Sequence, residues 1–263
     1  MPKFPLSPEL DALHDEAIAY ASAVQQQIAA RGGCKSLSSE ALNALGWSAV
    51  LLHRSVRTLC EEGWTPVTAP LIRSLLDVYG NCVAIGNNPA DADYMGFKYL
   101  SHFFLKWLTS PGITAGEIRA ATTSLNVFEG RLNPADQQKA KQLRARPTPR
   151  THWFQPEYDS IKDIFSLSQV PIYRLFQMFS GPTHGGFDLK ILMDDDMKSE
   201  DIDPRDHPKS VHKAIVASSR VLVEVCHIRD NWDNGDANEG MHKTFVSNLV
   251  KLRTQQTPPA ISD

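Results

Sequence analysis

Apolar residues recur along this chain at alternating steps of three and four, and this spacing constrains the fold more than any other feature. The clearest example is the series Leu42, Leu45, Ala49, Leu52, Val56 and Leu59. Because an α-helix has 3.6 residues per turn, such side chains form one stripe that must be buried against other elements. No segment shows the sustained apolar–polar alternation of a half-buried strand. The sequence therefore predicts an all-α fold with no significant sheet.

Capping and breaking residues divide this pattern into separate helices. Ser7-Pro8-Glu9 is a typical helix start, and Gly32-Gly33 ends the first helix. Thr114 and Glu117 have the spacing of a capping box. The aromatic-rich helix from Tyr94 to Leu108 is expected in the core. Later helices are expected at 156–167, 170–180, 209–230 and 238–253, with a loop at 187–207.

These helices are expected to form one domain, because no linker divides the chain. We predict a single bundle of about eight to ten helices over residues 1–253, followed by a flexible tail at 254–263. Hydrophobic residues make up 42% and charged residues 22%, which excludes a disordered chain. The N-terminal MPKFPLSPEL lacks an apolar signal segment, so a cytoplasmic protein with no membrane partner is expected.

No cofactor or metal is expected from the sequence. The four cysteines are far apart, with no CxxC pair, and are expected to be free thiols. Glu224-x-x-His227 has the spacing of a carboxylate-bridged metal site, and Asp11-x-x-His14 is a potential partner motif. The two further glutamates that such a site needs are missing, so we predict no metal ligands.

A basic, proline-broken segment follows the sixth expected helix. Its cations and the next tryptophan are Lys139, Lys141, Arg144, Arg146, Arg150 and Trp153. A solvated connector and an RNA-contacting surface both fit such a charge run. The chain has a net charge of -3 at pH 7, so any RNA contact must rest on this local patch. In that case we expect Arg144, Arg146, Arg150 and Trp153 to bind substrate.

Two further constellations could carry chemistry. Arg73 and Asp77 stand one turn apart and share a helix face with the small residue Gly80, which favours close packing. An exposed pair of this kind adds little to stability, whereas a pair in a cleft can orient a substrate. Ser180 and His184 lie in a Gly- and Pro-rich stretch, where histidine could transfer protons or simply cap a helix end.

The order of these residues resembles a known family. The matching positions are Leu71 to Asp77, then Trp153, and then Tyr173-x-x-Phe176-x-x-x-Ser180-x-x-x-His184. This order is similar to an uncharacterised bacterial all-helical family, recorded as a domain of unknown function, over roughly residues 65–190. Asp77 stands where glutamate is usual, and Phe176 where tyrosine is common.

The resemblance implies that five residues belong to one site, namely Arg73, Asp77, Tyr173, Ser180 and His184. It implies no established reaction. Such helical families are suspected relatives of HEPN ribonucleases, whose Arg-x(4-6)-His motif cleaves RNA without a metal. Arg220 to His227 and Arg146 to His152 both fit that spacing, although Val221 replaces the usual polar residue. A surface arginine and histidine would also explain the first pair.

Three functions are compatible with these residues. The first is a HEPN-like, metal-independent ribonuclease or a defence- or toxin-type protein, with RNA as partner and Arg220 and His227 as secondary catalytic candidates. The second is a non-enzymatic binding or sensor module in which the same residues form a structural polar core. The third is a small-molecule hydrolase that uses Ser180 and His184. Whether the protein is an enzyme and whether it forms a homodimer are both left open.

Overall fold

The computed structural model describes residues 4–87, 89–146, 152–155, 157–168, 175–176, 179, 208–235 and 237–255. Within these ranges the chain forms nine α-helices and no strand, which confirms the all-α prediction. The helices are α1 (Pro8–Ala30), α2 (Leu37–Glu61), α3 (Ala69–Gly86), α4 (Ala92–Leu108), α5 (Ala115–Gly130), α6 (Pro134–Arg144), α7 (Ile161–Ser166), α10 (Pro208–Asn234) and α11 (Glu239–Gln255). A short 3-10 helix, Thr65–Thr68, precedes α3.

The helix ends follow the local signals in the sequence. Ser7 accepts a hydrogen bond from the backbone N–H of Leu10 at the start of α1. Thr114 and Glu117 make both hydrogen bonds of a capping box at the start of α5. α11 continues to Gln255, two residues past the expected boundary at 253, and residues 256–263 lie outside the described ranges.

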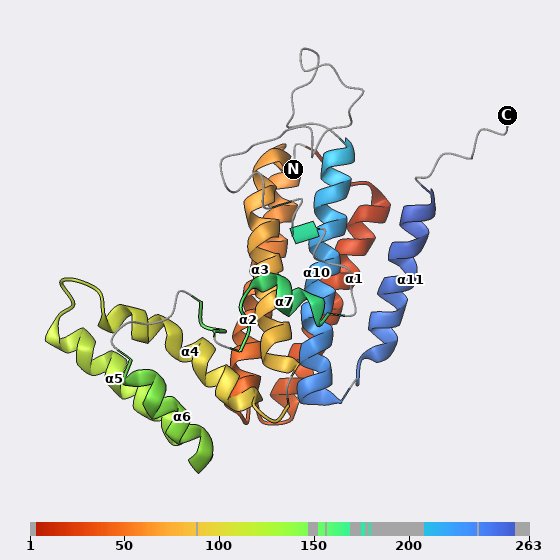
Figure 1. The fold of residues 1–263 in the computed structure, drawn as a ribbon. Helices are drawn as coiled ribbons and strands as arrows, with labels where there is room; N and C mark the ends of the chain where they lie inside the picture. Colours follow the sequence, from red (N-terminus) through yellow and green to blue (C-terminus); the bar gives the residue numbers. More distant parts are fainter. Residues whose placement is uncertain are drawn as a thin grey trace.

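Helix α10 is the centre of the bundle. Helices α1, α2 and α3 pack against it, and α11 lies against α1 and α10 (Figure 1). Between residues 214 and 226 of α10, every residue except Arg220 is buried. A helix that is apolar on nearly all sides is stable only when other helices surround it, and here they do.

Helices α4, α5 and α6 form an extension beside the bundle (Figure 1). The first half of α4 packs closely on the start of α2 at Gly96, where an added Cβ would lie 2.6 Å from the backbone of Leu37. Beyond this contact, α4 packs against α5 and α6, and Phe103 in its second half is 65% exposed. The expectation that all of this aromatic helix lies in the core is therefore wrong for its second half.

Helix α7 crosses α3 at a glycine. A Cβ at Gly80 would lie 2.9 Å from Ile161 Cδ1, so the absence of a side chain allows the two helices to approach.

All four cysteines are free, as expected. In the described part of the chain, no helix is long and apolar enough to cross a membrane.

Candidate functional site

A polar stripe runs along one face of α10. Its members stand at steps of four, three and four residues, and they are Arg220, Glu224, His227 and Asn231. Such steps keep side chains on one helix face. All four line a pocket of about 510 Å³ between α10, α11, the end of α3 and the residues after α7. The two-turn spacing of Arg220 and His227 thus places both secondary candidates in one pocket.

Glu224 is the centre of this stripe. Its side chain is only 6% exposed, and its Oε1 lies 2.7 Å from Nη2 of Arg220 one turn earlier. His242 of α11 places its Nε2 3.6 Å from the same oxygen. A buried carboxylate is stable when it has a cationic partner, so Glu224 fixes Arg220 at the pocket wall.

His227 and His242 form a stacked pair that joins α10 to α11. Their ring centroids are 3.9 Å apart and their planes differ by 4°. Asn231 Nδ2 lies 3.4 Å from Nε2 of His227. His242 Nε2 is buried and makes no hydrogen bond within the described residues. Both histidines also line a second, open hollow of about 620 Å³ along α11, so the pair stands where two hollows meet.

The opposite wall of the pocket carries a tyrosine and a serine. The hydroxyls of Tyr79 on α3 and Ser168 after α7 share a hydrogen bond. Burial raises the pKa of Tyr79 to about 12, and the nearby carboxylate of Glu224 acts in the same direction. Tyr79 therefore keeps its proton at neutral pH and can serve as a hydrogen-bond donor.

Arg73 and Asp77 form the expected ion pair, but away from this pocket. Their side chains are 17% and 47% exposed, so the pair is only partly buried. The Arg73 guanidinium carbon also lies 3.6 Å from the ring centroid of Phe176. Phe176 contacts Phe165, which stacks on Tyr79, so aromatic rings connect Arg73 to the pocket wall.

Phe176 is a described residue near the expected site, and it contacts Arg73. The other residues of the expected site, Tyr173, Ser180 and His184, lie outside the described ranges. Convergence of all five residues on one pocket therefore stays a prediction.

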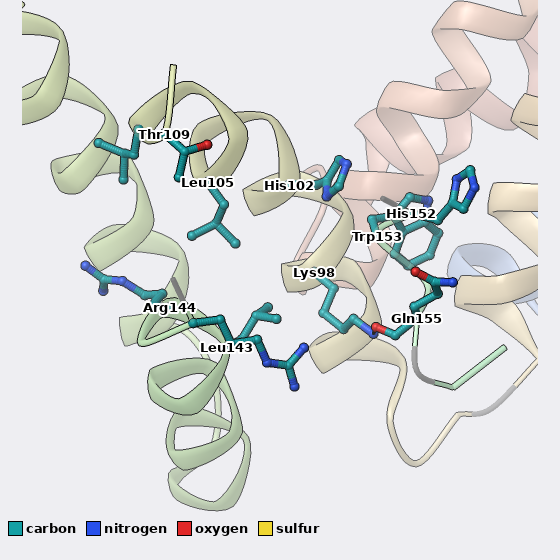
Figure 2. Close-up of a pocket in the computed structure, with 11 residues that line it drawn as sticks. Lys98, His102, Leu105, Thr109, Leu143, Arg144, His152, Trp153 and Gln155 are labelled. Carbon is teal, nitrogen blue, oxygen red and sulfur yellow. Dashed lines mark hydrogen bonds between the residues drawn. The ribbon is translucent and has the colours of Figure 1, made fainter. Parts of the chain in front are cut away.

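The basic segment lines another, smaller pocket of about 90 Å³ beside α4 (Figure 2). Its lining includes three of the four expected substrate-binding residues, Arg144, Arg146 and Trp153, together with Lys98 and three further polar side chains, His102, His152 and Gln155. Arg150 lies outside the described ranges. No carboxylate lines this pocket among the described residues.

Some of these cations are already neutralised. Arg144 Nη1 lies 2.6 Å from Glu129 Oε2, and Lys98 pairs with Glu157. Arg146 differs, because its Nη1 is buried and has no hydrogen-bond partner in the described part of the chain. Burial and the nearby positive charges, those of Lys106 and Lys98 among them, lower the pKa of His102. The pocket is thus cationic and favours an anionic group.

Trp153 has a structural role in this pocket. Its Nε1–H donates to Asn81 Oδ1 of α3 at 2.9 Å, and its ring meets Tyr99 edge-on. The indole is 8% exposed. Trp153 therefore anchors the basic segment to α3, which also carries Tyr79 of the larger pocket.

The residues weighed for a metal site do not come together. His14 stacks on His53 in the core, with ring centroids 4.5 Å apart, whereas His227 stacks on His242. Across the described residues, no group of three or more His, Cys, Asp or Glu side chains is placed to hold a metal ion.

The sequence indicated a shared helix face for Arg220 and His227 but not two of their neighbours in the pocket. Glu224 was considered only as a metal ligand, although polar residues at steps of four and three inside an apolar run indicate a polar stripe. His242 lies on another helix, and nothing in the local sequence connects it to His227. The chain matches no family model, no curated protein and no solved structure.

Proposed function

We propose that this protein is a metal-independent ribonuclease whose site is the pocket lined by Arg220, Glu224, His227 and His242. The observation that carries the proposal is the meeting of an arginine and two stacked histidines in one open pocket. Proton transfer by histidine and charge stabilisation by arginine are the functions that RNA cleavage without a metal requires. The proposal includes a distant HEPN-like relationship, because Arg220 and His227 have the spacing of that motif.

The chemistry is an internal phosphoryl transfer. A neutral imidazole of the pair accepts the proton of a ribose 2′-hydroxyl while the 2′-oxygen bonds to phosphorus. The phosphorus–O5′ bond breaks, and a protonated imidazole gives its proton to the leaving 5′-oxygen. Arg220 stabilises the negative charge that develops on the phosphoryl oxygens. The products are a 2′,3′-cyclic phosphate and a 5′-hydroxyl.

The stacked pair suits this exchange. Stacking holds the two imidazoles 3.9 Å apart, so both stand close to the same reacting phosphate. One imidazole that accepts a proton and one that donates a proton is the arrangement that acid–base catalysis uses. Glu224 and Asn231 hold Arg220 and His227 in place.

Two features support RNA rather than a small molecule as substrate. The histidines stand where two hollows meet, which gives room for a polymer to continue past the reacting phosphate. The cationic pocket of Arg144 and Arg146 is anchored to the same helix α3 and could hold a second phosphate. We also propose a cytoplasmic location and leave a homodimer open.

The experiment is cleavage of a labelled single-stranded RNA in the presence of a chelator. The wild-type protein is compared with His227→Gln and His242→Gln, because glutamine keeps polarity but cannot transfer protons at neutral pH. His212→Gln, on the same helix α10 and outside the pocket, is the matched control. We expect each pocket variant to lose activity by about 100-fold or more. The control should cleave like wild type, and thermal unfolding should show that all variants fold.

Intact RNA after incubation with folded wild-type protein would contradict the proposal. So would cleavage that both pocket variants retain. If the wild-type protein binds RNA without cleaving it, the non-enzymatic binding module replaces the ribonuclease.

A further inference from the structure

A buried arginine, with no carboxylate of the described residues in ion-pair distance, lies in the core on a different face of α10. Arg229 is 2% exposed and reaches between α1 and α2. Its Nη2 donates to Gln25 Oε1 at 2.8 Å and to Asn43 Oδ1 at 2.7 Å. Both acceptors are neutral amides. In the described part of the chain, no carboxylate stands within ion-pair distance of Arg229, and its Nε is buried with no hydrogen-bond partner.

The backbone of α2 makes room for this guanidinium. A Cβ at Gly46 would lie 2.2 Å from Nη1 of Arg229, so any other residue at position 46 would displace the side chain. Nη1 also has no hydrogen-bond partner among the described residues. A glycine inside a helix is unfavourable relative to alanine, and here it makes room for the buried guanidinium.

The acid that acts on Arg229 over a longer distance is Asp233. Burial raises the pKa of Asp233, although the hydrogen bond from Ser39 and the charge of Arg229 oppose that rise. Ser39 Oγ donates to the Oδ1 of Asp233. Asp233 is therefore held by α2 and does not form an ion pair with Arg229.

Arg229 lines a pocket of about 210 Å³ between α1, α2 and α10. Arg54 lines it as well, is exposed, and forms no ion pair with a described residue. The remaining walls are apolar or neutral, and they include Ile18, Val50 and the half-exposed indole of Trp47. No carboxylate of the described chain lines the pocket, so the two arginines are the charged groups among its lining residues.

We infer that this pocket binds a small organic carboxylate with an apolar body. A buried cation is stable when an anion shares its site, and because Nη2 of Arg229 already donates to Gln25 and Asn43 and Nε is buried, Nη1 is the nitrogen that can donate to a carboxylate. Arg229 and Arg54 bind the carboxylate, and Trp47, Ile18 and Val50 contact the hydrocarbon part. The site shares no lining residue with the histidine pocket, so it is a ligand site separate from the proposed ribonuclease activity.

The test uses benzoate as the carboxylate probe and benzamide as its neutral isostere. Binding is measured by calorimetric titration and by shifts of the Trp47 indole N–H signal in nuclear magnetic resonance spectra. We expect saturable binding of benzoate but not of benzamide. Arg54→Gln, an exposed substitution compatible with folding, should weaken benzoate binding by about tenfold, the loss expected for one charged hydrogen bond. Arg119→Gln, an exposed arginine on α5, is the matched control and should leave binding unchanged.

Trp47→Ala keeps both arginines and should weaken binding through loss of the apolar wall. Equal binding of benzoate and benzamide would overturn the inference, as would benzoate binding that Arg54→Gln leaves unchanged. Absence of saturable binding by benzoate and by hexanoate, a flexible carboxylate, would overturn it as well. None of these readouts depends on RNA cleavage, so the two proposals fail separately.

Discussion

Acid should destabilise this fold through the stacked pair of His14 on α1 and His53 on α2. Both rings are buried in the core, and His53 Nδ1 lies 2.9 Å from Ser218 Oγ of α10. Burial, aided by the charge of Arg57, lowers the pKa of His14 to about 4. Burial, aided by the neighbouring His14 and Arg57, lowers the pKa of His53 to about 3. The folded protein therefore keeps both rings neutral near pH 7.

The direction and size of the effect follow from these values. An unfolded histidine has a pKa of about 6.5. Below that pH the two histidines bind protons in the unfolded chain but stay neutral in the folded chain. The stability due to the neutral pair is fully present above about pH 6.5 and is lost as the pH falls towards the folded values. At about pH 5 each histidine lowers the free energy of unfolding by about 2 kcal/mol relative to pH 8, and the pair lowers it by about 4 kcal/mol.

The assay is urea unfolding at pH 8 and at pH 5, with the free energy of unfolding compared between the two. His14→Phe keeps an aromatic ring against His53 but cannot take up a proton. We expect the loss of stability between the two pH values to be smaller in this variant by about 2 kcal/mol. His152→Gln, an exposed histidine, is the matched control and should lose as much stability as wild type. An equal loss in wild type and His14→Phe would refute this reasoning.

Three further predictions concern packing, charge and thiols. Gly96→Ala should destabilise the protein by about 1–3 kcal/mol in urea unfolding, because the new Cβ meets the backbone of α2, whereas Gly116→Ala, where the new Cβ makes only an ordinary contact with Thr114 Oγ1 at 4.0 Å, should not. Asp77→Asn should cost less than about 1 kcal/mol because the pair is partly exposed, and Arg73→Ala about 1–2 kcal/mol because a ring contact is lost too. A thiol reagent should label Cys34 first in the native protein, since the other three cysteines are buried with raised pKa values.

Each of these predictions has a clear contrary result. A Gly96→Ala protein as stable as the Gly116→Ala protein would mean that α4 does not pack closely against α2 at position 96. A loss of several kcal/mol in Asp77→Asn would mean that this carboxylate has a buried structural role. Rapid labelling of all four thiols without denaturant would mean that the core opens easily.

The fold could be predicted because its signals are local. The apolar spacing from Leu42 to Val56 predicts the buried face of α2, and capping residues such as Ser7 and Thr114 mark the helix starts. The exposure of Phe103 could not be predicted, because aromatic content does not say whether another helix covers a given turn. That depends on where α5 and α6 lie, which is a tertiary property.

The candidate site was predictable only where its residues share a helix. Arg220 and His227 stand two turns apart, so their common face follows from helix geometry. His242 reaches His227 only because α11 folds back beside α10. Arg229 resembles a surface residue in the sequence, and the signal that could have revealed its burial is Gly46, an isolated glycine inside a helical pattern.

The most direct test of the ribonuclease proposal uses an oligonucleotide with one ribose at a defined position among deoxyriboses, incubated with a chelator. Attack by a 2′-hydroxyl predicts a single cut after that ribose, with a 2′,3′-cyclic phosphate as the new end. The fully deoxy strand should stay intact, and His242→Gln should leave both strands uncut. Cleavage of the fully deoxy strand, or equal cleavage by wild type and His242→Gln, would contradict a site in which the stacked histidines transfer the proton.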